Sequence, residues 1–166
     1  MFRKTIDFIN DWKEESKMTL KIFKHLTDES LSTKVTPTGR SLGFLAWHIS
    51  LTPGEMLTRA GLVLNSPLPH APVPSKVSEI CEVYKNVTES LLEVVGEKWK
   101  DEQLTDEVEM YGEKWTKGMT LFILVKHQTH HRGQMTVLMR QAGLIVPGAY
   151  GPAREEWAAY GMPTME

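Results

Sequence analysis

Three histidines have the residue type and spacing for metal chemistry. His127 and His131 lie four residues apart in the segment KHQTHHRGQM. In a helix this spacing places both imidazoles on one face, one turn apart, where they can reach the same ion. His48 lies in the segment LAWHIS, within a second expected helix. Because bundles build metal sites from side chains on facing helices, these histidines predict a metal site.

The alternative is that the histidines are ordinary helix residues, since two histidines at this spacing are a weak signal alone. Both, however, interrupt the apolar inner stripe of their helix. Burying imidazoles there costs free energy unless their nitrogens find partners, and a shared ion would supply one. Gln128 follows His127, so the HExxH pattern of zinc metalloproteases is absent from this segment.

Three neutral imidazoles without a fourth protein ligand are typical of an open, catalytic metal site. Such ligands favour one divalent transition metal, namely Zn, Ni, Fe, Co or Cu, with Mn as a further candidate, over Mg or Ca. The chain has 166 residues, of which 41% are hydrophobic. A helical domain of this size can bury a core without a metal, so we expect the site to serve function rather than folding.

Two further residues near the histidines, Gln134 and Glu55, each have two possible roles. Gln134, three residues after His131, either orients a ligand or is an ordinary polar helix residue. Glu55 is a candidate general base or a solvated glutamate, so the catalytic residue stays unknown. His130 points about 100° away from His131 and should face a neighbouring helix, a partner subunit or solvent. No nucleotide cofactor is expected, because the sequence has no glycine-rich phosphate loop.

Four long helical patterns must position these residues. Apolar residues recur at helical spacing over residues 2–26, 39–60, 75–96 and 116–142, with Pro- and Gly-rich joints between them. Residues 107–115 form a hairpin or a loop, and a short helix is expected over residues 154–160. The pattern predicts an all-α four-helix bundle that forms one domain over residues 1–166.

The composition excludes several classes of function. The net charge is −2, from 19 basic and 21 acidic residues with no basic stripe, so no nucleic-acid partner is expected. No apolar stretch is long enough to predict a membrane helix. Charges interrupt the N-terminus, which argues against a signal peptide and predicts a cytoplasmic protein. Cys81 is the single cysteine, so an internal disulfide is excluded.

The sequence resembles the DinB-like (DNA-damage-inducible) family, which includes YfiT-type metal-dependent hydrolases. The resemblance lies in LAWHI around His48, HQTHHRGQ around His127 and His131, and the following RQAGLIVPGAYGP. It extends over nearly the whole chain. It implies a four-helix bundle with up-down-down-up connectivity, a homodimer, and a metal site at His48, His127 and His131.

The resemblance leaves the chemistry open. Some relatives are S-transferases or isomerases that depend on a low-molecular-weight thiol, either bacillithiol or mycothiol. The first hypothesis is therefore a metal-dependent enzyme that transfers a thiol to a small-molecule substrate. The alternatives are a metal-dependent hydrolase, a non-catalytic metal-binding stress-response protein, or an interaction module in which the histidines are core residues.

Overall fold

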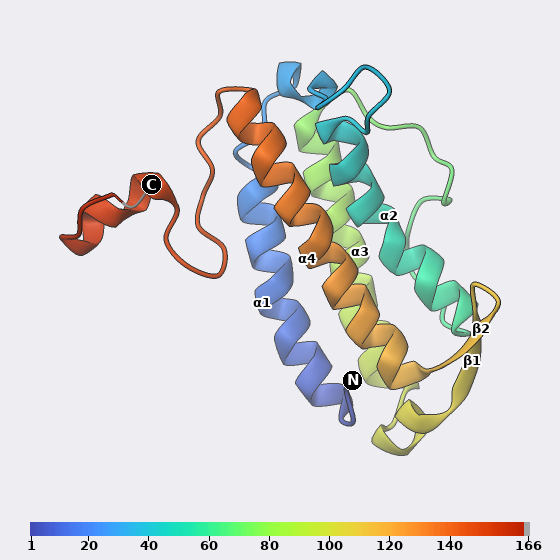
Figure 1. The fold of residues 1–166 in the computed structure, drawn as a ribbon. Helices are drawn as coiled ribbons and strands as arrows, with labels where there is room; N and C mark the ends of the chain where they lie inside the picture. The colour runs from blue at the N-terminus through green and yellow to red at the C-terminus, as the bar shows by residue number, and fades with distance from the viewer. Residues whose placement is uncertain (165–166) are drawn as a thin grey trace.

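The computed structural model describes residues 1–164, and its main feature is a bundle of four helices (Figure 1). These are α1 (Thr5–Phe23), α2 (Leu42–Arg59), α3 (Val77–Lys98) and α4 (Lys117–Gln141). The hairpin of β1 (Glu107–Met110) and β2 (Glu113–Thr116) precedes α4, and short 3₁₀ helices span Glu29–Ser32, Asp101–Thr105 and Arg154–Tyr160. The predicted all-α class is confirmed. None of the helices formed by residues 1–164 is long and apolar enough to cross a membrane.

Hydrogen bonds at the helix ends define the directions of the helices. The Phe2 N–H donates to the Gly118 carbonyl at 3.3 Å, so α1 and α4 begin at the same end of the bundle. The Thr5 N–H donates to the Asp101 carboxylate at 2.8 Å, so α3 ends where α1 begins. Residues 61–76 return along the bundle from the end of α2 to the start of α3 (Figure 1). Helices α2 and α3 therefore run opposite to α1 and α4.

The helix boundaries follow local chemistry, with small differences from the predicted ones. Side-chain caps start α2 and α4: the Ser41 and Thr116 hydroxyls each accept a backbone N–H three residues ahead, at 3.1 Å. Helix α1 begins at Thr5 rather than residue 2, because the preceding backbone bonds to α4 instead. Helix α3 continues through Gly96 to Lys98 and delivers Trp99 into the core, where it is buried.

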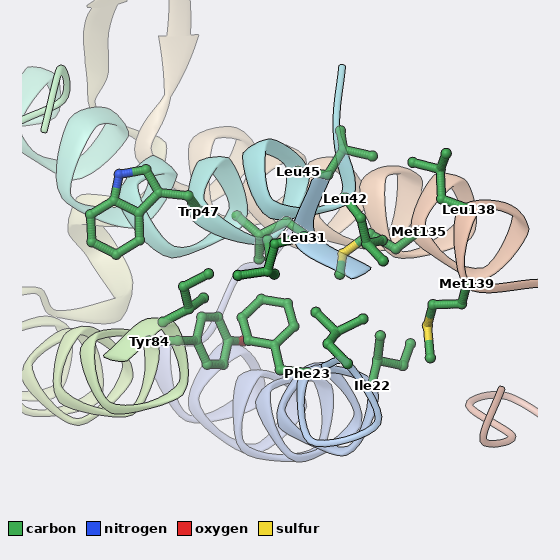
Figure 2. Packing of buried hydrophobic residues seen from close by; sticks show 14 of the residues in the cluster. Ile22, Phe23, Leu31, Leu42, Leu45, Trp47, Tyr84, Met135, Leu138 and Met139 are labelled. Atoms are coloured by element: carbon green, nitrogen blue, oxygen red, sulfur yellow. The ribbon is translucent and has the colours of Figure 1, made fainter. Parts of the chain in front are cut away.

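The hydrophobic core consists of two clusters that flank the predicted site. The first cluster is shown in Figure 2 and includes Phe23, Leu45, Tyr84, Met135 and Leu138. The second cluster lies further along the bundle and includes Phe8, Trp12, Leu57, Leu91 and Leu124. On α4, Leu124 and Met135 belong to different clusters and bracket both predicted ligands. The core therefore holds this part of α4 in place from both sides.

A buried ion pair joins α1 to α4. Arg132 is 2% exposed and its guanidinium Nη2 lies 2.5 Å from the Glu15 carboxylate. Arg132 Nη1 also donates to the Glu15 carbonyl at 2.8 Å and to the Thr19 hydroxyl at 3.1 Å. The Tyr150 hydroxyl, from the segment after α4, bonds to the same carboxylate at 2.7 Å. This Glu15–Arg132 pair thus links two helices and the C-terminal segment.

Candidate metal centre

The structure brings His48, His127 and His131 together. His48 comes from α2 and the other two from α4, and these two helices pack against each other. Nε2 of His127 lies 3.2 Å from Nε2 of His48 and 3.1 Å from Nε2 of His131. One nitrogen from each of the three residues lies within 4.8 Å of the others. This convergence is the geometry that the sequence spacing predicted.

The arrangement fits a shared ion better than mutual hydrogen bonds. Each ring nitrogen carries either one hydrogen or one lone pair, so Nε2 of His127 can form only one good hydrogen bond. It nevertheless faces two other Nε2 atoms at hydrogen-bond distance. Nitrogens bound at about 2.1 Å to one ion lie roughly 3.0–3.4 Å apart, depending on the coordination angle. The two Nε2 separations agree with this spacing.

Burial keeps the three imidazoles in the form that binds metals. Desolvation, together with charge repulsion from the neighbouring His131 and His48, lowers the pKa of His127 to about 4. Desolvation also lowers the pKa of His48 and of His131 below the ordinary value. At neutral pH each ring is therefore uncharged and has a lone pair available for an ion.

Gln134 orients one of the candidate ligands. Nδ1 of His131 donates to the Gln134 side-chain carbonyl at 2.8 Å, which leaves the Nε2 lone pair directed at the other histidines. The Gln134 amide lies 3.0 Å from Nε2 of His130, which is exposed and lies outside the three-histidine group. Of the two readings for Gln134, the structure supports the one in which it orients a ligand. By contrast, Nδ1 of His127 is buried without a hydrogen-bond partner in residues 1–164, so packing alone orients this ring.

Glu55 forms contacts with residues other than the histidines, although its charge is close enough to act on His48, whose pKa it raises against the larger effect of desolvation. Its carboxylate accepts a hydrogen bond from the Tyr111 hydroxyl at 3.2 Å and lies 3.6 Å from Nε of Arg59. The Arg59 guanidinium also lies over the Tyr111 ring, 4.8 Å from its centroid. These partners tie Glu55 to the β1–β2 hairpin, which favours a structural role over that of a general base.

Sequence reasoning missed two arginines close to the site. Arg132 follows a candidate ligand directly, yet it is buried against α1. Arg40 lies over the Phe44 ring at 5.3 Å, and Phe44 stacks on His48 with ring centroids 5.9 Å apart and an angle of 14° between the planes. The signal for the Phe44–His48 stack was their four-residue spacing on one face of α2, whereas Arg40 lies before the first residue of that helix.

Acidification should destabilise the metal-free protein between about pH 6.5 and pH 4. His127 takes up a proton near its ordinary pKa of 6.5 in the unfolded chain, but only at a pKa of about 4 when folded. Between these values the unfolded state binds more protons, so the free energy of unfolding falls as the pH falls. Melting temperatures measured in EDTA should show this decline, and it should be shallower for His127→Gln. Equal slopes for both proteins would assign the acid sensitivity to other groups.

The fold and the site together define a class: a four-helix bundle that presents a histidine cluster from two facing helices. The family model of the DinB family matches residues 1–165, and the chain belongs to this family. The resemblance seen in the sequence is therefore confirmed.

Similar proteins agree with this assignment. YrdA of Bacillus subtilis strain 168, described as an uncharacterized protein, is 39% identical over 162 residues, which are 98% of this chain and 97% of YrdA. The crystal structure of a DinB-like protein from Bacillus cereus ATCC 10987 has 39% identity and a TM-score of 0.86, covering 90% of this chain and all (100%) of that one. YjoA, a DinB-like protein from Bacillus subtilis, has a TM-score of 0.67 at 19% identity, covering 86% of this chain and 97% of its own, and shows the fold alone.

Proposed function

We propose that this protein is a metal-dependent enzyme that transfers a low-molecular-weight thiol to an electrophilic small molecule. His48, His127 and His131 would hold one divalent transition-metal ion. The observation that carries the proposal is the convergence of three Nε2 atoms from α2 and α4, with His127 Nε2 at 3.2 Å and 3.1 Å from the other two. A metal bound at such ligands supplies Lewis acidity, which lowers the pKa of a coordinated thiol or water.

The ligand set supports the binding of an anion. The group contains three histidines and neither a carboxylate nor a thiolate. Because all three imidazoles are neutral, they leave the full charge of a divalent cation uncompensated. A soft anionic sulfur is a suitable additional ligand for a borderline metal. His48 and Phe44 are partly exposed, so a small molecule can reach the histidines from solvent.

The position of Glu55 favours the thiol over water as the nucleophile. Hydrolysis needs water to lose a proton, and the pKa of water must fall from about 15.7 to about 7 on the metal before this happens at neutral pH. A thiol ionises near pH 8.5 and therefore needs less assistance from a base. Glu55, the base candidate from the sequence, is held by Tyr111 and Arg59 instead. The site therefore favours a thiol, which ionises without a strong base, over water, which requires one.

Cobalt spectroscopy tests the proposal. Protein loaded with Co²⁺ should gain a sulfur-to-metal charge-transfer band in the near ultraviolet when a low-molecular-weight thiol is added. His48→Ala should abolish the band, because it removes one of three ligands, whereas His130→Ala should retain it. A thiol-dependent turnover screen with small electrophiles then separates an enzyme from a protein that only binds metal.

Two results would contradict the transferase proposal. Thiols could leave the cobalt spectrum unchanged while the loaded protein cleaves test esters or amides, which would favour the hydrolase alternative. A charge-transfer band without turnover of any electrophile would favour the non-catalytic metal-binding alternative.

A further inference from the structure

A hollow lies between α2, α4 and the segment before α2. Its volume is about 400 Å³. Four apolar side chains, two polar side chains and one glycine line it. We call this set the Arg40 groove: Val35, Leu45, Val137, Leu138, Arg40, Gln134 and Gly39. An apolar hollow with few polar groups is the usual form of a small-molecule site.

Two lines of residues connect the Arg40 groove to the histidines. On α4, Gln134 lines the groove and also accepts the hydrogen bond from Nδ1 of His131. At the start of α2, the guanidinium of Arg40, which precedes the helix, continues the stack of the Phe44 and His48 rings. A ligand in the groove would therefore lie beside the candidate metal centre rather than at a separate place on the surface.

Arg40 has no carboxylate partner within the part of the chain that the structure describes. Each ion pair formed by residues 1–164 joins other residues. An arginine beside apolar walls matches a planar anion joined to an apolar body, since its guanidinium can bind both carboxylate oxygens.

We propose that the Arg40 groove binds a small organic carboxylate, with the carboxylate on Arg40 and the apolar body against Val137 and Leu138. This defines the class of the electrophilic substrate. The placement of its reactive end at the histidines rests on the proposed function, whereas binding of the carboxylate to Arg40 does not require the metal.

The test compares hexanoate with hexanol on the full chain, as purified and after chelation. Titrations followed by amide NMR shifts should place hexanoate at Gly39 and Val137 in both forms. Arg40→Gln should weaken hexanoate binding about three- to tenfold, as expected for the loss of one charge-assisted contact near solvent. Hexanol should bind wild type as weakly as hexanoate binds Arg40→Gln. Arg3→Gln, which removes an exposed positive charge at the other end of the bundle, should have no effect.

The outcomes separate this proposal from the proposed function. Equal affinities for hexanoate and hexanol, or no loss in Arg40→Gln, would overturn the carboxylate proposal. Hexanoate binding that needs zinc and is lost in His48→Ala but not in Arg40→Gln would place the carboxylate on the metal, which leaves the metal centre intact and refutes the groove. Arg40-dependent binding to a protein that carries no transition metal as purified, and takes up none when zinc is added, would support the groove and refute the metal centre.

Discussion

Protein purified without a histidine tag is expected to carry up to one transition-metal ion per chain, and His127→Ala is expected to lose most of it. Nε2 of His127 is the central atom of the group, at 3.2 Å from His48 and 3.1 Å from His131. Loss of an outer residue that only orients a ligand lowers metal affinity roughly 10- to 100-fold. Loss of a ligand itself should cost more than that, and Gln134→Ala should fall within the smaller range. Elemental analysis and competition with a chelating dye measure both effects.

His130→Ala is the matched control, because this neighbouring histidine is exposed and lies outside the group. It should keep its metal. Chelation should leave the helical circular-dichroism signal intact, because the two core clusters do not depend on the ion. Unfolding on chelation would make the site structural. Full metal content in both His127→Ala and His131→Ala would show that the site is assigned wrongly.

Arg132→Met is expected to lower the free energy of unfolding by about 3–5 kcal/mol, as breaking a buried pair from one side typically does. The substitution leaves the Glu15 carboxylate, which is 6% exposed, buried without its cation. The remaining hydroxyl partners, among them Tyr150, cannot neutralise the charge. Urea denaturation measures the loss. Glu15→Leu combined with Arg132→Met should recover much of it, because an apolar pair of similar volume has no charge to desolvate.

Arg140→Met is the control for this prediction. Arg140 lies on the same helix and pairs with Glu155, but both side chains are well exposed. Water and salt already screen that pair, so the urea midpoint should change little. If Arg132→Met and Arg140→Met were equally mild, Glu15 would have to regain water in the variant, and the pair would not anchor α1 to α4.

The helices and the histidine pair could be predicted because each depends on the spacing of residues within one short segment of the sequence. Apolar spacing within each segment located all four bundle helices to within a few residues, and the short helix expected over residues 154–160 is present as a 3₁₀ helix. The spacing of His127 and His131 is also a property of one helix. His48 needed one more assumption, namely that an inward histidine on another helix would face the first two, and the bundle does place it there.

The two arginines were not predictable because their roles depend on distant parts of the chain. Arg132 and Glu15 are 117 residues apart in sequence, and nothing near either residue specifies the other. Arg40 lies in a polar joint, where a solvated arginine is the ordinary expectation. The groove around it exists only once α2 packs against α4. The hairpin of β1 and β2 is predicted only as one of two alternatives, a hairpin or a loop, since its four-residue strands are too short for a distinctive pattern.

The adjacent side chains of His131 and Arg132 point in directions about 100° apart around the axis of α4. One side carries a candidate ligand, and the other is fixed to α1 through Glu15. The helix therefore cannot rotate about its own axis to suit a larger or smaller ion without breaking its anchor. The selectivity among metal ions would then depend on the fixed positions of the ligands, because the helices cannot shift to adjust them. A designer who transplants the three histidines into another bundle should move positions 15 and 132 with them.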